Sequence, residues 1–463
     1  MNDNTQQLTT LMPKGNLKGV AITLVAALAA YILYAVLPFE ANANKGLAIL
    51  LFVAILWFTE AVHITVTAIM VPILAAVSGI PEMDTKAALS SFADPIIYIF
   101  FGGFALATAL HIQKLDRKIA LWLISLSGGN MMLAVLLIFA VTAFLSMWIS
   151  NTATAAMMLP LALGMMDHLD RQKDRKTFVF VLLGIAYSAS IGGLGTIVGS
   201  PPNAIAAKAL NLDFVGWMKL GLPMMLLILP LMLLSLYLVL RPKFGKTTAD
   251  THEEQAIPWT PVRIITLLLF ACTALAWIFS GYVKDWLGVT NPDTVIALIA
   301  AVMVVVLGLA SWKDVADNTD WGVLMLFGGG IALSVLLQKS GASLVLGQQM
   351  ATAFVLAHPF IVIMGVAAFI IILTEFTSNT ASAALLVPIF ASIATQMGLP
   401  KEVLVMVIGI GASCAFMLPV ATPPNAIVFG TGLIQQRDMM RVGVLLNAMC
   451  IVLVAAWAYL FLM

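Results

Sequence analysis

Charged residues are scarce in this chain. Only 10% of its 463 residues are Asp, Glu, Lys or Arg, whereas a soluble globular chain carries about 25%. The hydrophobic share is 62% and the mean hydropathy is +1.04. So much apolar surface cannot be buried inside a water-soluble core. The composition therefore predicts an integral membrane protein with many spans.

Other absences exclude several classes of function. The net charge of +1 provides no basic surface, so we expect no nucleic-acid partner. The three cysteines, Cys272, Cys414 and Cys450, have neither disulfide nor metal-site spacing. The sequence contains no His-Glu-x-x-His, no Gly-x-Ser-x-Gly and no paired catalytic carboxylates. We therefore expect no enzyme activity and no resident cofactor.

The long apolar segments predict the spans. The polar start, MNDNTQQLTTLMPKGNLKG, is too long for a cleaved signal peptide, so the first apolar segment is expected to be a retained span. A spanning helix needs roughly 20 apolar residues. About eleven segments are candidates: residues 19–38, 46–59, 64–80, 96–113, 178–207, 217–240, 262–281, 293–311, 321–337, 402–430 and 440–462.

Two further apolar stretches predict re-entrant hairpins. Residues 131–166 would form a single helix about 54 Å long, far more than the ~30 Å hydrocarbon core. Basic sequences flank this stretch on both sides, KLDRK before it and RQKDRK after it, and basic loops favour the cytoplasm. A hairpin keeps both flanks on one side. Residues 359–397 have nearly uncharged flanks, so we expect a second hairpin that enters from outside.

The distribution of basic residues predicts the orientation. With the N-terminus in the cytoplasm, this arrangement places 16 of the 23 Lys and Arg residues on the cytoplasmic side and 7 outside. We therefore expect a multi-pass protein of the inner (plasma) membrane, with its N-terminus cytoplasmic and its C-terminus outside. Glu60 and His63, between the second and third spans, are expected at the cytoplasmic interface.

Three motifs recur in the same order in the two halves of the chain. The pairs are FGGFAL at 101–106 with GGGIAL at 328–333, SNTATAAMMLP at 150–160 with SNTASAALLVP at 378–388, and VGSPPNAI at 198–205 with VATPPNAI at 420–427. Their offsets are 227, 228 and 222 residues. An odd number of spans separates the copies, so they face opposite ways. Inverted repeats of this kind are typical of secondary transporters.

The Pro-Pro pairs predict interrupted helices. Pro201-Pro202 and Pro423-Pro424 lie inside long apolar segments, and proline removes a backbone donor and clashes with the preceding turn. Each pair should split its span around an unwound joint, whose free carbonyls suit a small hard cation such as Na⁺. The helix that starts after each joint or hairpin tip offers free N–H groups to an anion. Each half thus predicts a cation site beside an anion site.

Charge is also missing from these polar motifs. The Ser-Asn-Thr and Pro-Pro-Asn motifs contain no Lys, Arg, Asp or His. An anion must therefore be held by neutral donors and helix ends, with bound cations offsetting its charge. Glu375 lies three residues before Ser378; we expect it to stabilise the hairpin, with a proton-carrying role as the alternative. Helix packing is the alternative role for a lone Ser-Asn-Thr triplet, but the duplication disfavours it.

These motifs resemble those of the divalent anion/sodium symporter family, and most closely its bacterial INDY-type sodium/dicarboxylate cotransporters, over essentially the whole chain. The resemblance implies a homodimer in the lipid bilayer, in which a transport part slides as an elevator against a dimerising scaffold, with Na⁺ as the coupling ion. It implies sodium sites at Ser146, Ser150, Asn151 and Gly199, and at Thr374, Thr377, Asn379 and Ala421. It implies substrate contacts from Asn151, Thr152, Ser200, Pro201, Ser378, Asn379, Thr380, Thr422 and Pro423.

The motif order and the resemblance together predict the domain organisation. Two amphipathic segments, His111–Ser125 and Gln338–Phe354, precede the hairpins and are expected to be interfacial arms. The expected divisions are 1–18, a cytoplasmic segment; 19–125, scaffold and arm of the first half; 126–240, transport part of the first half; 241–261, a cytoplasmic linker; 262–357, scaffold and arm of the second half; and 358–463, transport part of the second half.

The expected function is sodium-coupled import of C4-dicarboxylates such as succinate, malate and fumarate. The alternatives are another divalent oxyanion (sulfate or citrate), proton coupling through Glu375, or a passive channel, which would need a continuous pore. Moving each charge of a dianion into a negative-inside cell costs about 2.3 kcal/mol per 100 mV. Two Na⁺ only neutralise the dianion and a third would drive accumulation, but no third site is evident in the sequence.

Overall fold

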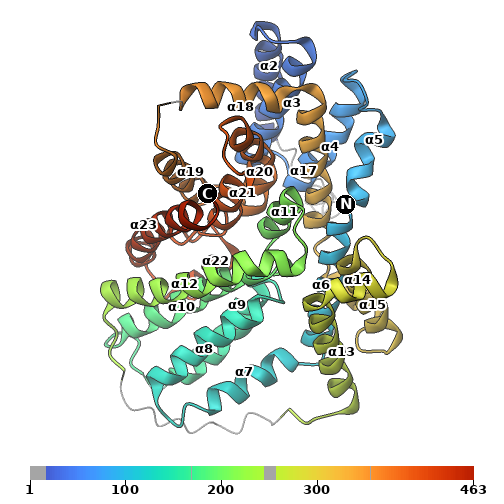
Figure 1. The fold of residues 1–463 in the computed structure, drawn as a ribbon. Coiled ribbons are helices and arrows are strands. Elements are labelled where there is room, and N and C mark those ends of the chain that lie inside the picture. The colour runs from blue at the N-terminus through green and yellow to red at the C-terminus, as the bar shows by residue number, and fades with distance from the viewer. Residues whose placement is uncertain (1–16, 168, 245–256, 355) are drawn as a thin grey trace, which may run out of the picture.

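The computed structural model describes all residues except 1–16, 168, 245–256 and 355. The described part is helical from α2 to α23 and contains no strand (Figure 1). The predicted all-helical membrane class is therefore confirmed. Most of the expected N-terminal segment (1–18) and most of the expected linker (241–261) lie outside the described residues.

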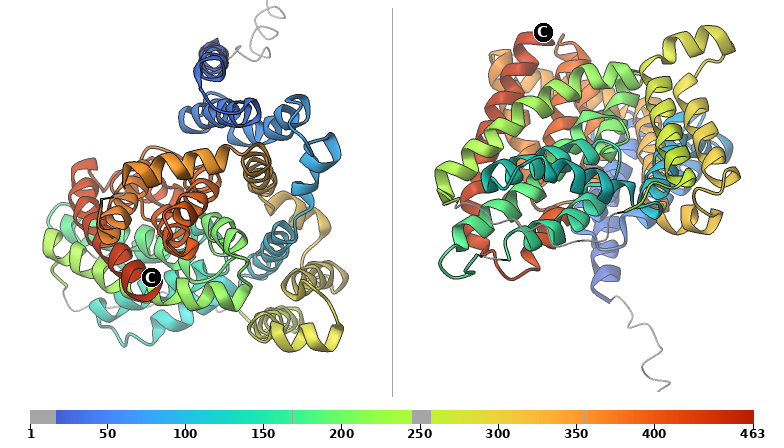
Figure 2. Two further views of the ribbon diagram at one scale, coloured as in Figure 1. Left: turned by 45° about the horizontal axis from the view of Figure 1, so that its top comes forward. Right: turned by 90° about the horizontal axis from the view of Figure 1, so that it is seen from below.

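Eight helical segments of the described chain are long and apolar enough to cross a membrane. They are Leu17–Val36 (α2), Ala41–Thr59 (α3), Thr85–Ile112, Arg175–Gly195 (α10 and η2), Phe214–Leu240 (α12), Pro261–Ile278 (α13), Trp321–Ser340 (α17) and Gln436–Phe461 (α23). The segment Thr85–Ile112 consists of α5 (Thr85–Ser90), the 3₁₀ turn η1 (Ser91–Ala93) and α6 (Pro95–Ile112). Each one overlaps a span predicted from the sequence. Helix α2 packs on α3 at the edge of the molecule (Figure 2).

The other three predicted spans are shorter or interrupted. Helices α4 (Ile64–Val77) and α15 (Pro292–Val306) have 14 and 15 residues. Soon after each of them a glycine, Gly79 or Gly308, has φ 67°, a left-handed conformation that ends a helix. The third, predicted over 402–430, consists of α21 (Lys401–Gly411) and α22 (Pro423–Phe429) with non-helical chain between them.

Both predicted hairpins are present as pairs of helices. The first pairs α8 (Met131–Ser146) with α9 (Asn151–Met165), and the second pairs α19 (Pro359–Leu373) with α20 (Asn379–Gln396). Ser150 and Ser378 lie at the tips and cap the returning helices, since their hydroxyls accept hydrogen bonds from the backbone of Ala153 and Ala381. The Ser-Asn-Thr triplets therefore mark the tips, as the sequence predicts.

Each Pro-Pro pair starts a helix after an irregular joint. In the first half, α10 (Arg175–Gly192) ends in the short 3₁₀ turn η2 (Gly193–Gly195), and α11 (Pro201–Leu210) follows. In the second half, α21 and α22 flank the joint. The remaining short helices are α7 (Leu115–Ser125), α14 (Ser280–Leu287), α16 (Trp312–Asn318) and α18 (Ala342–Ala353).

Glycines allow helices of the two halves to pack closely against each other. A Cβ atom on Gly102 of α6 would lie 2.5 Å from the carbonyl oxygen of Ala297 on α15, and one on Gly329 of α17 would lie 2.6 Å from that of Ala68 on α4. These positions therefore need glycine for the backbones to approach so closely. Each half thus packs a helix of its own against one of the other half.

Candidate ion and anion site

The first hairpin tip brings several oxygen atoms to one point. The Ser146 Oγ atom lies 2.6 Å from the side-chain amide of Asn151 and 2.6 Å from the carbonyl oxygen of Ala189. The same end of the Asn151 amide lies 3.1 Å from the Ala189 oxygen and 3.3 Å from the Gly199 oxygen. Three neutral oxygens therefore face one atom of Asn151. Either the amide nitrogen donates to them, or a cation binds there and the amide oxygen becomes a fourth ligand.

Glycines allow the first joint to reach this tip. A Cβ atom on Gly193 would lie 2.6 Å from Asn151 Oδ1, and one on Gly199 would lie 2.5 Å from the Gly193 oxygen. Both glycines are buried. Larger residues would separate the hairpin from the joint, so the glycines hold the two parts of the oxygen cluster together.

The second half repeats the arrangement. Thr374 Oγ1 lies 2.6 Å from Asn379 Oδ1 and 2.8 Å from the carbonyl oxygen of Ala412. Ser146 and Asn151 correspond to Thr374 and Asn379 at the offset of 228 residues. The carbonyl of Ala412 takes the place that the carbonyl of Ala189 has in the first half. We call each set an oxygen triangle. Of the residues expected at the two sodium sites, the triangles contain Ser146 and Asn151 or Thr374 and Asn379. Each triangle adds one carbonyl, of Ala189 or Ala412, that was not predicted.

Thr377 and Ala421, expected at the second sodium site, make other contacts. The Thr377 hydroxyl bonds to the Leu373 carbonyl at 3.0 Å and to Ser382 Oγ at 2.8 Å. The Ala421 amide donates to the Leu418 carbonyl at 3.2 Å. The Thr377 hydroxyl therefore lies outside the triangle, and a role of the Ala421 backbone at the sodium site stays a prediction.

The expected substrate residues lie at helix starts. Ser200 and Thr422 immediately precede α11 and α22 and are buried, and the Ser200 Oγ atom lies 3.4 Å from that of Ser413. The others vary in exposure: Thr152 and Pro423 are exposed, and Asn151, Pro201, Ser378, Asn379 and Thr380 are half-buried. Helix α9 packs on α22, and α20 packs on α11. Each hairpin helix of one half therefore packs against the helix that follows the joint of the other half.

A second pair of asparagines holds the joints. Asn203 Nδ2 donates to the carbonyls of Gly193 and Thr196, both at 2.7 Å. Asn425 Nδ2 donates to those of Ala415 and Leu418 at 3.1 and 3.0 Å, at the same sequence separations. Both side chains are fully buried, and the Oδ1 atom of each has no partner among the described residues. No role was predicted for these two asparagines, although their repetition in the Pro-Pro-Asn motif was the available signal.

Replacing either joint asparagine by aspartate should loosen its joint. Asn203→Asp or Asn425→Asp keeps the shape but removes the two N–H donors. A protonated carboxyl can donate to only one of the two buried carbonyls, and an ionised one to neither. We expect a loss of roughly 1–3 kcal/mol in the free energy of unfolding, measured by thermal melting of the purified protein. Asn318→Asp, on the exposed helix α16, is the matched control. Unchanged melting of both joint variants would contradict this role.

Glu375 connects the second tip to the second joint. Its carboxylate accepts hydrogen bonds from the backbone amides of residues 416–418 at 2.7–3.1 Å and from Asn447 Nδ2 at 2.7 Å. The side chain is 1% exposed. In the first half, Thr196 donates instead to the carbonyl of Met147, the residue 228 positions before Glu375. All the Glu375 partners are N–H donors, which suits a fixed, deprotonated carboxylate that stabilises the hairpin.

Residues 16–463 match the family described as the sodium:sulfate symporter transmembrane region. The chain belongs to this family. The resemblance to the divalent anion/sodium symporters is thereby confirmed, and the protein is a transporter, not an enzyme.

Relatives of this transporter span nearly its whole length. An uncharacterized transporter of Haemophilus influenzae is 54% identical, over 93% of this chain and 94% of that relative. The sodium-dependent dicarboxylate transporter SdcS of Staphylococcus aureus is 31% identical, over 89% of this chain and 85% of the relative. Among solved structures, the Alcanivorax borkumensis YdaH transporter has a TM-score of 0.56 at 13% identity, covering 96% of this chain and 98% of that one. That last likeness shows the fold alone.

Proposed function

We propose that this transporter couples the import of C4-dicarboxylates, such as succinate, malate and fumarate, to Na⁺ entry. The observation that carries the proposal is the repeated oxygen triangle, in which a hydroxyl, an amide and a carbonyl meet at each hairpin tip. Neutral oxygens of this kind are ligands for a small hard cation. The residues present therefore fit one Na⁺ beside each tip, held by Ser146, Asn151 and Gly199 or by Thr374 and Asn379.

The same tips suit a dianion. Helices α9 and α20, with 15 and 18 residues, begin at Asn151 and Asn379. Their first N–H groups and the positive ends of their dipoles attract a carboxylate from each half. No cationic side chain lies in these motifs, so bound Na⁺ supplies the balancing positive charge. Anion binding and cation binding thus favour each other electrostatically.

The names of the staphylococcal relatives support dicarboxylates as the transported substrate. The staphylococcal relatives are named for sodium-dependent dicarboxylate transport, at 30–31% identity. The family description names sodium and sulfate. Sulfate, or citrate as another divalent oxyanion, is therefore the second candidate for the same site.

We further propose an elevator arrangement within a homodimer of the inner membrane, with the N-terminus cytoplasmic and the C-terminus outside. Residues 19–125 and 262–357 would form the static scaffold, and residues 126–240 and 358–463 the moving part. Helices α7 and α18 directly precede the hairpins, and they would act as the arms between the two parts.

Uptake into liposomes tests the proposal. Purified protein in liposomes should accumulate labelled succinate under an inward Na⁺ gradient, and should not do so when K⁺ replaces Na⁺. Competition by malate, fumarate, citrate and sulfate would then rank the cargoes. Sodium-driven uptake of sulfate without uptake of succinate would favour the second candidate. Uptake driven equally well by a proton gradient without Na⁺ would contradict sodium coupling.

A further inference from the structure

The second glycine of each repeated Gly-Gly pair contacts the part proposed to move. A Cβ atom on Gly103 of α6 would lie 3.1 Å from Val198 Cγ1, in the first joint. One on Gly330 of α17 would lie 3.0 Å from Ala384 Cβ, on the second hairpin. Both contacts are tight for a Cβ atom, so glycine permits the close approach at each.

These two contacts are not equivalent under the repeat. Gly103 corresponds to Gly330, Val198 to Val420, and Ala156 to Ala384, by the motif offsets of 227, 222 and 228 residues. If both halves packed alike, Gly330 would meet Val420, or Gly103 would meet Ala156. The structure instead shows the joint contact in one half and the hairpin contact in the other.

The two partners that are not in contact are exposed. Val420 is 83% exposed, and Ala156 on α9 is also exposed. In contrast, Ala384 is 1% exposed and Val198 is half-buried. Val420, the counterpart of Val198, is thus an exposed apolar residue that lacks the glycine contact made by Val198.

The aromatic residues at the tips show the same asymmetry. Trp148, at the first tip, is half-buried, with its ring centre 5.3 Å from that of Phe270 and 6.5 Å from that of Trp277, both on α13. Its counterpart 228 positions later, Phe376, is 69% exposed. Trp148 and Val198 are therefore packed against α13 and α6, whereas their counterparts Phe376 and Val420 are exposed.

We propose that Gly103 and Gly330 are paired sliding contacts, each of which alternates between the joint valine and the hairpin alanine of its own half. In the state described here the contacts are Gly103 with Val198 and Gly330 with Ala384. In the opposite-facing state they are Gly103 with Ala156 and Gly330 with Val420. This inference rests on the proposed alternating access. It adds which residues of the static and moving parts contact each other in each state.

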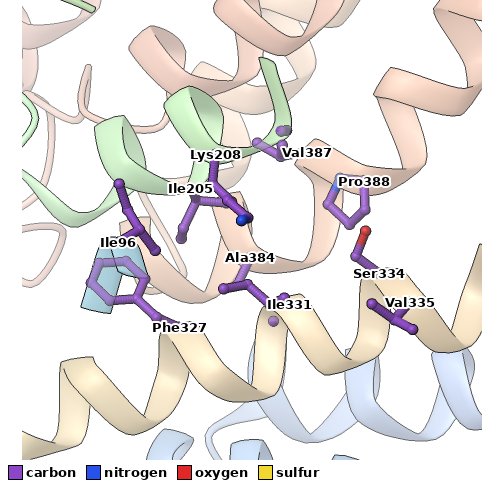
Figure 3. Close-up of a pocket in the computed structure, with 12 residues that line it drawn as sticks. Ile96, Ile205, Lys208, Phe327, Ile331, Ser334, Val335, Ala384, Val387 and Pro388 are labelled. Carbon is purple, nitrogen blue, oxygen red and sulfur yellow. The ribbon is translucent and has the colours of Figure 1, made fainter. Parts of the chain in front are cut away.

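Two physical features favour such an exchange. In either state one glycine contacts a joint valine and the other contacts a hairpin alanine. The buried apolar area therefore changes little between the states, and their free energies stay close. In addition, a cavity of about 180 Å³ lies beside Gly330 between α17, α11 and α20 (Figure 3). The pocket is partly open to the surface, so unfilled space rather than a packed core borders the contact between Gly330 and Ala384 on one side.

Paired cysteines test the exchange. In a background with Cys272, Cys414 and Cys450 replaced by alanine, four pairs are compared: Gly103→Cys with Val198→Cys, Gly330→Cys with Ala384→Cys, Gly330→Cys with Val420→Cys, and Gly103→Cys with Ala156→Cys. Disulfides have Cβ atoms about 3.5–4.5 Å apart. The two pairs in contact in this state would place their Cβ atoms 3.0 and 3.2 Å apart, so each must separate by a few tenths of an ångström to form the bond. All four pairs should cross-link in cycling protein, and each cross-link should abolish uptake until it is reduced. The control, Val198→Cys with Gly330→Cys, joins non-partners and should not cross-link.

A second test uses single cysteines and leaves Gly103 and Gly330 unchanged. Thiol labelling of Val420→Cys and Ala156→Cys should fall under the ligand conditions that raise labelling of Val198→Cys and Ala384→Cys. If sodium-driven uptake is intact but the Gly330–Val420 and Gly103–Ala156 pairs never cross-link and labelling is not reciprocal, the inference is wrong. If these pairs cross-link but succinate is not carried, the cargo proposal fails and the sliding contacts stand.

Discussion

Asn151→Ala and Asn379→Ala should each impair Na⁺ binding and dicarboxylate binding together. Each asparagine belongs to an oxygen triangle and begins the helix proposed to face the anion. Alanine removes the amide ligand and leaves the hydroxyl of Ser146 or Thr374 without this partner. A cost of about 1–3 kcal/mol weakens binding roughly 5- to 150-fold. Because ion and anion are electrostatically linked, we expect uptake at low Na⁺ to be lost.

The measurement is Na⁺-dependent stabilisation and succinate uptake over a range of Na⁺ concentrations. Asn318→Ala is the matched control, because this exposed asparagine lies on the short helix α16, outside the hairpins and joints. If either tip variant kept normal sodium-dependent uptake, the tip assignment would be wrong for that half.

Glu375→Gln should destabilise the second joint but leave coupling to Na⁺ intact. Glutamine has one acceptor oxygen in place of two, and its NH₂ group faces backbone donors from residues 416–418. Hydrogen bonds to charged groups contribute about 1.5–3 kcal/mol, so we expect a lower melting temperature and lower uptake. The remaining uptake should keep the sodium dependence and the pH profile of the parent protein.

The proton-coupled alternative makes the opposite prediction for this variant. If Glu375 carried the coupling proton, a proton gradient would drive uptake by the parent protein without Na⁺, and Glu375→Gln would abolish that uptake completely. Glu82→Gln is the control, because Glu82 is an exposed carboxylate whose partner is Lys339 at the surface. A surface ion pair contributes little to stability, so this change should leave melting and uptake unchanged.

The repeated motifs predicted most of what the structure shows. The Ser-Asn-Thr triplets lie at the tips, and the Pro-Pro pairs begin helices after irregular joints, because capping and proline geometry are local properties of the sequence. The carbonyls of Ala189 and Ala412 could not be predicted, since every residue has a carbonyl and only the fold selects these two. Likewise, the partners of Glu375 lie 41–72 residues away in the sequence.

The predicted spans show a different limit of sequence reasoning. Residues 64–80 and 293–311 are apolar enough for spans, but α4 and α15 end earlier, and left-handed glycines follow them. Hydropathy reports the composition of a segment and cannot show that the conformation of a single glycine ends the helix. The difference between Val198 and Val420 could not be predicted either, because their motifs are similar in sequence and only the structure shows that one is packed and the other exposed.

The joint asparagines also bear on the speed of the transport cycle. Asn203 and Asn425 already fix two carbonyls in each unwound segment, at 2.7–3.1 Å. A segment that became ordered only when an ion arrived would lose backbone entropy at that moment, about 1–2 kcal/mol for each residue fixed. Here that cost is met during folding, so at the proposed sodium sites an ion would meet a pre-organised backbone. Ion capture and release can therefore be fast without the joint refolding in every cycle.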